Sequence, residues 1–167
     1  MARGDDEFIE FVRASSAQLL HAAYLLTGDR HAAEDAVQTT FARTYAAWSR
    51  VRRDDAVAYS RRVLVNHLTD RWRRRFREYA TDDLPEPPDN SDLADQVALR
   101  RWLVGALAVL TMRERAVIVM RYLFDLPEAA VAHDLGITIG TVKSTSSRAL
   151  AKLRISADDE AEVTDHG

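Results

Sequence analysis

The sequence predicts an all-α protein of two small helical domains, joined by an acidic linker that contains proline. Alternating runs of β-branched residues are absent, and alanine, leucine and arginine, which favour helices, dominate the composition. Apolar residues recur at helical spacing on both sides of residues 81–91. That segment itself holds three prolines and an excess of acids, which is the composition of a linker.

Three amphipathic helices are expected in the N-terminal domain. Asp5 or Asp6 caps the first helix, and Gly28 ends it. Asp29 caps the second, and the third runs from about 56 to 77. Their apolar stripes are expected to form the core of one bundle. The stripe residues are Phe8, Phe11, Val12, Leu19, Ala22, Ala23 and Leu26, then Ala33, Val37, Phe41, Tyr45 and Trp48, then Leu64, Leu68, Trp72 and Phe76.

The C-terminal domain is expected to contain four helices. The first follows Ser91 as its cap, and Thr111 with Glu114 forms a capping box for a second helix that continues through Phe124. Two short helices follow at 128–135 and 139–154, and the chain after about Ser156 is expected to lack regular structure. The apolar stripe of the first helix comprises Leu93, Val97, Val104, Leu107 and Leu110. The predicted organisation is therefore a domain at 5–77, a linker at 78–92, a domain at 93–155 and an acidic tail at 156–167.

Residues 128–147 carry the pattern of a helix-turn-helix. Ala132 is small where the two helices cross, and Gly136 tolerates the positive φ of the turn. Thr138 caps the second helix, whose Val142 is buried on the first. The rest of this small core is Val131, Leu135 and Ile137, and the open face carries Lys143, Ser144, Ser147 and Arg148. Small, polar and basic side chains suit entry into a DNA groove, although an ordinary αα-hairpin is the alternative interpretation.

The charges are segregated along the chain, so the net charge of −3 conceals a basic block. Residues 61–77 hold seven arginines against one acid, Asp70, and residues 78–95 hold seven acids and no basic residue. A basic block indicates a polyanionic partner, with a solvated helix face as the alternative.

The composition also excludes several classes of protein. Without cysteine the chain suits a reducing compartment, and it has neither a signal peptide nor the roughly 20 consecutive apolar residues of a membrane span, so a cytoplasmic location is expected. No HExxH motif or phosphate-binding loop occurs, so neither enzymatic activity nor a metal or cofactor is expected. Of the scattered histidines, His67 lies inside the basic helix and is expected to face nucleic acid or solvent.

Three segments together resemble a known family. Residues 126–154 resemble the C-terminal domain with which bacterial extracytoplasmic-function (ECF) sigma factors of the sigma-70 class recognise the −35 promoter element. Residues 33–48 resemble the segment that binds the clamp helices of RNA polymerase, and residues 59–75 resemble the segment that recognises the −10 element. Order, spacing and the acidic linker match over about 5–155, and the Leu-Leu-Thr-Gly-Asp motif at 25–29 resembles the SigE-like branch.

The resemblance implies roles for individual residues. It assigns polymerase contact to Asp35, Gln38, Phe41 and Arg43, recognition of the −10 element to Arg62, Asn66, Asp70, Arg71 and Arg74, and recognition of the −35 element to Thr141, Lys143, Ser144, Ser147 and Arg148. Within these sets Asn66 would help hold a flipped base, whereas for Phe41 we favour a plain core position. The implied partners are core RNA polymerase, promoter DNA and an anti-sigma factor.

Four positions depart from the family pattern. Pro127 stands where the family usually has a capping serine, and proline is tolerated in a first helical turn. Thr39 replaces a common glutamate, which weakens one expected polymerase contact. Asp70 stands where some members of the family carry a neutral amide, which leaves the −10 base preference open. Thr145 replaces a common arginine, which is expected to remove one phosphate contact.

The predicted function is that of a sigma factor, which binds core RNA polymerase and directs promoter-specific initiation through the −10 and −35 elements. The alternative is a conventional helix-turn-helix regulator that binds duplex DNA on its own. That alternative leaves the arginine-rich N-terminal module unexplained and lacks an obvious dimerisation helix. A protein-binding helical adaptor is a third alternative, for which the chemistry of the open helix face would be accidental.

Overall fold

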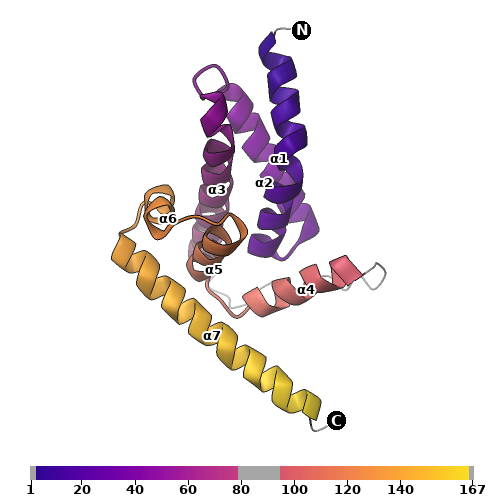
Figure 1. Cartoon of the computed structure of the whole chain (residues 1–167), viewed down its shortest axis with the longest axis vertical. Coiled ribbons are helices and arrows are strands. Elements are labelled where there is room, and N and C mark those ends of the chain that lie inside the picture. The colour runs from indigo at the N-terminus through magenta and orange to yellow at the C-terminus, as the bar shows by residue number, and fades with distance from the viewer. Residues whose placement is uncertain (1–2, 79–94, 166–167) are drawn as a thin grey trace. The chain divides into compact units, whose positions relative to one another are not determined.

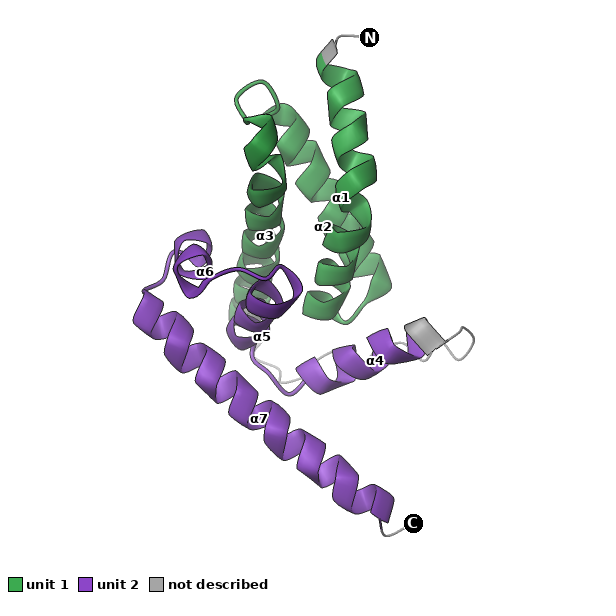
Figure 2. Ribbon diagram, viewed as in Figure 1, with its two compact units in different colours: residues 1–84 green, residues 85–167 purple. Residues whose placement is uncertain are grey.

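The computed structural model describes residues 3–78 and 95–165, and every regular element within those ranges is a helix (Figure 1). The chain divides into two compact units, residues 1–84 and 85–167 (Figure 2). Most of the predicted linker, with the expected cap Ser91 and the stripe residue Leu93, lies outside the described residues. The predicted all-α class is confirmed.

The first unit is a bundle of three long helices, α1, α2 and α3, each of which packs on the other two. Their bounds are Arg3–Thr27 for α1, Arg30–Ala46 for α2 and Ala56–Glu78 for α3, with a short 3₁₀ turn, η1, at Arg53–Asp55. Leu19, Leu26 and Leu64 are fully buried between them. Gly28, with a φ of 70°, ends the first helix. The Asp29 carboxylate then caps α2 by accepting from the backbone N–H of His31 at 2.8 Å.

The predicted cap of the first helix is wrong. Because α1 already begins at Arg3, Asp5 and Asp6 lie inside its first turn, where their negative charges favour the helix dipole instead.

Two of the predicted apolar stripes contain residues near their C-terminal ends that are not buried in the core. Tyr45 is 52% exposed, and Trp72 is only partly buried, although Leu64 and Leu68 on the same helix are buried. Positions four residues apart advance by about 40° round a helix of 3.6 residues per turn, so such a stripe turns away from the buried face within two or three steps. Trp48 lies beyond the end of α2 and packs with its ring centroid 5.1 Å from that of Phe8. The side chain of Phe76 lies outside the described part of the structure.

The second unit contains α4, α5, η2, α6 and α7. Their bounds are Asp95–Leu107 for α4, Met112–Ile118 for α5, Val119–Leu123 for the π-helical segment η2, Glu128–Leu135 for α6 and Ile139–Asp165 for α7. The predicted capping box is confirmed: Glu114 N–H donates to Thr111 Oγ1 at 3.2 Å, and Thr111 N–H donates to Glu114 Oε1 at 2.9 Å. Helix α6 forms directly after Pro127, which gives it no side-chain cap.

The expectation that regular structure ends near Ser156 is wrong, because α7 continues to Asp165. Once a helix is nucleated and packed, each further residue costs little, and the alanines and glutamates of 157–162 are good helix formers. The extension is exposed and acidic, as the sequence predicts for this part of the chain.

Candidate nucleic-acid interface

The turn between α6 and α7 has the backbone geometry of a helix-turn-helix. Gly136 adopts the left-handed conformation, with φ 65° and ψ 36°. Its N–H donates to the carbonyl of His133 at 3.3 Å, and the N–H of Ile137 donates to the carbonyl of Ala132 at 3.0 Å. This pair of hydrogen bonds is a Schellman motif, which satisfies the last carbonyls of α6 and turns the chain sharply.

Packing between the two helices fixes the orientation of α7. Val131 and Val142 are fully buried, and Ala132 is 5% exposed. Thr138 caps α7, since its Oγ1 accepts from the backbone N–H of Thr141 at 3.1 Å. The predicted roles of these residues and of Gly136 are confirmed, whereas Leu135 and Ile137 are only half-buried.

The open face of α7 presents the side chains that the sequence places there. Lys143, Ser144, Ser147 and Arg148 are all exposed. Lys143 Nζ lies 3.9 Å from a carboxylate oxygen of Glu128, a loose ion pair that leaves the ammonium available. Thr141 is half-buried, and its hydroxyl lies 2.8 Å from that of Thr138. The face therefore offers one ammonium, one guanidinium and two small hydroxyls within two helical turns.

Thr145 is fully buried, so its own side chain faces the core and not the open face of α7. The expected loss of one phosphate contact at this position stays a prediction. The hydroxyl oxygen of Thr145 accepts a hydrogen bond from Arg148 Nη2 at 3.4 Å, and this contact helps to orient the Arg148 side chain on the open face.

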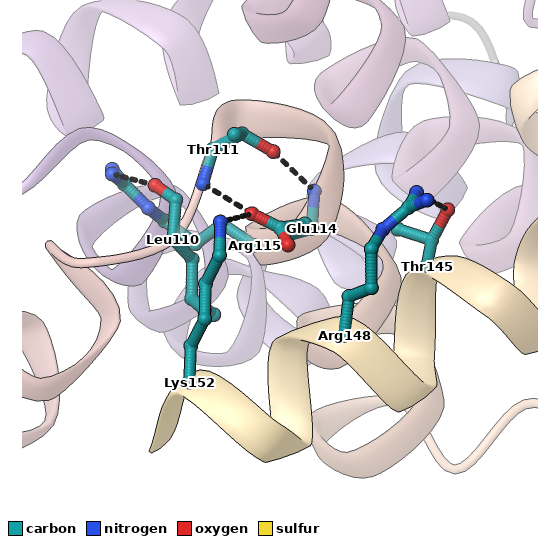
Figure 3. A network of polar contacts seen from close by, with 7 residues as sticks. All are labelled: Leu110, Thr111, Glu114, Arg115, Thr145, Arg148 and Lys152. Atoms are coloured by element: carbon teal, nitrogen blue, oxygen red, sulfur yellow. Dashed lines mark hydrogen bonds and ion pairs between the residues drawn. The ribbon is translucent and has the colours of Figure 1, made fainter. Parts of the chain in front are cut away.

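A partly buried polar network joins α7 to the start of α5 (Figure 3). Lys152 Nζ lies 2.7 Å from Glu114 Oε1, the same carboxylate oxygen that accepts from Thr111 N–H. Beside it, Arg115 donates to the carbonyl of Leu110 at 3.2 Å, and burial lowers the pKa of the Arg115 guanidinium. Sequence reasoning missed Lys152, because nothing local marks a lysine as the partner of a carboxylate 38 residues away.

In the first unit, the expected −10 residues all lie on α3, where Arg62 is half-buried. Arg62, Asn66 and Asp70 are spaced one turn apart, Asn66 is half-buried and Asp70 is exposed. The guanidinium of Arg62 lies 6.0 Å from the centre of the Tyr59 ring. Arg71 and Arg74 are exposed on the same helix.

An open pocket of about 430 Å³ lies beside these residues. Its walls come from the end of α2, from the turn that follows and from one face of α3. The lining residues are Arg43, Ala46, Ala47, Arg50, Tyr59, Val63, Asn66, His67 and Asp70. Asn66 and Asp70 therefore share a cavity with Arg43, which the sequence groups with the polymerase-binding residues.

His67 contributes a neutral imidazole to this pocket. Its buried Nδ1 atom makes no hydrogen bond with the described residues. Burial lowers the pKa of His67, and the positive charges of Arg43, Arg71 and Arg74 lower it further, against a smaller opposing effect of Asp70. Sequence reasoning noted His67 as a residue facing nucleic acid or solvent, but gave no sign of this cavity.

The expected polymerase-binding residues lie along α2. Asp35, Gln38 and Arg43 are exposed. Phe41 is half-buried and meets the Phe11 ring edge-on, with 6.1 Å between the ring centroids. This contact agrees with the packing role that we favour for Phe41.

Two features are absent from the described residues, 3–78 and 95–165. Across those ranges no helix has the length and apolarity needed to cross a bilayer. The same residues contain no cluster of three or more histidine, aspartate or glutamate side chains that could hold a metal ion.

Comparison with known proteins identifies both units. Residues 11–78 match the family described as Sigma-70 region 2, and residues 106–154 match Sigma-70, region 4. The two units are therefore those of a promoter-recognising transcription factor of the sigma-70 class.

The relatives narrow this class further. The RNA polymerase sigma-E factor of Streptomyces coelicolor is 42% identical over 150 residues, which cover 89% of this chain and 84% of the relative. The sigma-E factor of Streptomyces antibioticus is 40% identical over 92% of this chain and 87% of its own length. The ECF RNA polymerase sigma factor SigL of Mycobacterium tuberculosis is 36% identical, with 86% and 85% covered.

Solved structures share the fold. The structure of CnrH in complex with the cytosolic domain of CnrY has a TM-score of 0.67 at 24% identity and covers 91% of this chain and 88% of that one. The sigma factor RpoE in complex with the anti-sigma factor NepR from Bartonella quintana has a TM-score of 0.64 at 24% identity, with 87% and 94% covered.

The chain belongs to the sigma-70 family, as one of its ECF RNA polymerase sigma factors. Its function is to bind core RNA polymerase and direct promoter-specific initiation of transcription. The predicted family and function are confirmed, and the alternative of an independent helix-turn-helix regulator is not supported.

Proposed function

We propose that this sigma factor divides promoter recognition between its two units. A domain at residues 5–77 binds polymerase and the −10 element, and a domain at residues 93–155 binds the −35 element. The observation that carries this division is the open face of α7: Lys143, Ser144 and Ser147 are exposed immediately after a helix-turn-helix turn. Side chains three and four residues apart on a helix reach neighbouring base edges together.

Run-off transcription from a promoter library, with purified chain and core polymerase, tests recognition of the −35 element. Each lost base contact is expected to cost about 1–3 kcal/mol, so Lys143→Ala and Ser147→Ala relax or shift the selected −35 bases. Arg154→Ala on the same helix is the control, because it removes an exposed cation two turns beyond the open face. If the selected −35 sequence is the same for all variants, these residues do not recognise bases.

We assign the −10 element to Arg62, Asn66, Asp70, Arg71 and Arg74 in the first unit. The exposed Arg71 and Arg74 are suited to phosphates, contacts with which fix register without specifying sequence. Asn66 is suited to a base, since an amide both donates and accepts. Asn66→Ala should therefore impair open-complex formation more than closed-complex binding. Arg74→Ala should instead weaken binding evenly across sequences and reduce the salt dependence by about one phosphate.

Polymerase contact is assigned to the outer side of α2, where Asp35 and Gln38 are exposed. Asp35→Lys should abolish capture by core polymerase while the helical circular dichroism signal stays unchanged. Glu34→Lys makes the same charge change at the neighbouring position and serves as the control. Equal capture of the wild type and Asp35→Lys would remove this residue from the interface.

We also propose that this chain has an anti-sigma partner and lies in the cytoplasm. It acts by binding and not by catalysis. Support for the partner comes from the neighbouring folds, both of which are described in complex with a second protein, for RpoE the anti-sigma factor NepR. Purification of the tagged chain from its own cells, after a gentle lysis, tests for a stoichiometric companion other than polymerase subunits.

A further inference from the structure

The end of α2 and the turn after it carry side chains for two different neighbours. We call residues 43–50 the wall segment, because four of its members line the pocket of the first unit: Arg43, Ala46, Ala47 and Arg50. Backbone hydrogen bonds, such as that from Arg50 N–H to the Ala47 carbonyl at 2.8 Å, wind the segment into helical turns beyond the end of α2. At about 100° per residue the four lining positions share one side of the segment, and Tyr45 and Trp48 fall on the opposite side.

The opposite side of the wall segment meets the first turns of α1. The Trp48 ring centroid lies 5.1 Å from that of Phe8 and 5.4 Å from that of Phe11. The Tyr45 ring centroid lies 4.9 Å from that of Phe8, and the Tyr45 hydroxyl donates to Asp5 Oδ1 at 2.9 Å. Aromatic rings at these separations attract one another, and the hydrogen bond joins residues 40 positions apart in the sequence. These are therefore tertiary contacts, which α2 does not make on its own.

Two further contacts join the same part of α1 to this turn. Arg53, in η1, forms an ion pair with Glu7. A Cβ atom at Gly4 would lie 3.8 Å from Trp48 Cδ1, so the backbone of α1 itself passes close to the Trp48 ring. We call residues 4–11 of α1 the brace, since they contact the outer side of the wall segment and the turn after it.

The brace lies outside the core of the three-helix bundle. Leu19 and Leu26 are fully buried further along α1, whereas Phe8, Phe11 and Trp48 are only half-buried. The core of the bundle can therefore form without tight packing of the brace. What the brace fixes is the position of the wall segment relative to α3.

We infer that Trp48 is a positioning residue for promoter opening: by packing on the brace, it holds the wall segment at the distance from α3 that binding of the opened −10 strand requires. The inference rests on the proposed −10 role of the first unit and extends it to α1, to which that role assigns no residue. Groups on two opposed walls act together only at one separation, and a misplacement of about 1 Å between cooperating groups can cost on the order of 100-fold in rate. Trp48 acts through the backbone of the wall segment and needs no contact with DNA itself.

The first test uses the full chain with core polymerase and a promoter that carries 2-aminopurine in the −10 element. The rise in 2-aminopurine fluorescence on strand opening gives the opening rate at saturating holoenzyme, while capture by core polymerase and closed-complex binding are measured separately. Trp48→Ala should slow opening by about tenfold or more, with capture and closed-complex binding changed by less than about twofold. Trp48→Phe keeps an aromatic ring against Phe8 and Phe11 and should recover most of the rate.

Leu26→Ala is the control for lost stability, because it removes a fully buried side chain of the same bundle away from the brace. At a temperature where circular dichroism shows both variants folded, Leu26→Ala should open the promoter at the wild-type rate. Wild-type opening by Trp48→Ala, or an equal loss in both variants, would overturn the inference.

A second test leaves the aromatic rings of the brace intact. Glu7→Arg or Arg53→Glu alone places like charges together and should slow opening by about two- to fivefold, the factor that corresponds to a partly exposed ion pair. The double variant re-forms the pair with its signs exchanged and should return to the wild-type rate. If Trp48→Ala does not fold, this set decides alone: additive losses in the double variant, or no loss in either single one, refute the inference.

Failure of the proposed −10 role gives a different result. Asn66→Ala then opens the promoter at the wild-type rate, and opening by the wild-type chain does not depend on the −10 sequence. If Asn66→Ala is slow and Trp48→Ala is not, the −10 role stands and the positioning role of Trp48 is refuted.

Discussion

The ion pair of Lys152 with Glu114 gives the sharpest prediction for the second unit. Lys152→Met removes the ammonium but keeps most of the aliphatic side chain, so packing changes little. The Glu114 side chain is 5% exposed and that of Lys152 is 44% exposed, with 2.7 Å between Nζ and Oε1 (Figure 3). The variant therefore leaves a nearly buried carboxylate without its cation.

The loss in free energy of unfolding that we expect for Lys152→Met lies between two limits. A hydrogen bond to a charged group contributes about 1.5–3 kcal/mol, and an exposed ion pair about 0.2–1 kcal/mol. Lys152 is partly in solvent, and Thr111 still donates to Glu114 in the variant. We therefore expect Lys152→Met to lower the free energy of unfolding by about 1–2 kcal/mol.

Amide hydrogen exchange measured on α5 and α7 assays this loss, since it localises the change to the second unit. Lys143→Met is the matched control: its partner Glu128 is 3.9 Å away and both side chains are more exposed, so the expected change is below about 0.5 kcal/mol. Equal protection in the two variants would refute the reasoning.

The pH dependence of this ion pair provides an independent check. Burial opposes ionisation of Glu114, but the hydrogen bonds from Lys152 and Thr111 outweigh it and hold the pKa of Glu114 below its ordinary 4.5. A lowered carboxyl pKa stabilises the folded state above the unfolded value, and this stability is lost as the pH falls through the lower folded value. The difference between wild type and Lys152→Met should therefore persist at neutral pH and vanish in acid.

Three further predictions concern single residues. Gly136→Ala should cost about 1 kcal/mol or more in thermal unfolding, because φ is 65° although no atom blocks a Cβ; an unchanged midpoint would contradict the strain argument. Because the pKa of His67 lies below the ordinary 6.5, the unfolded chain takes up the proton before the folded chain does as the pH falls. The first unit should therefore become less stable below that pH, and His67→Gln should remove this pH dependence of stability in urea titrations. Leu64→Ala should cost about 3 kcal/mol and Trp72→Ala less, since only Leu64 is fully buried; the reverse order in urea unfolding would argue against the described core.

Short-range signals made much of the fold predictable. The Asp29 cap, the box of Thr111 with Glu114 and the left-handed Gly136 all depend on residues no more than a few positions away. These interactions join residues that are close in sequence, so the starts of α2 and α5 and the helix-turn-helix could be predicted from the sequence. The exposure of Lys143 and Ser147 follows as well, because the buried Val142 fixes the face of α7.

What the sequence by itself determined is therefore the order of the helices, the caps at Asp29, Thr111 and Thr138, and the class of each unit. The tertiary structure alone decided which distant residues meet: Arg43 with Asp70 in one pocket, and Glu114 with Lys152 across 38 residues. It also decided that Thr145 is buried. These outcomes depend on how packed helices are rotated about their axes, and a few tens of degrees of rotation moves a side chain between core and solvent. No local pattern fixes that rotation, because it is set by the sum of contacts between helices.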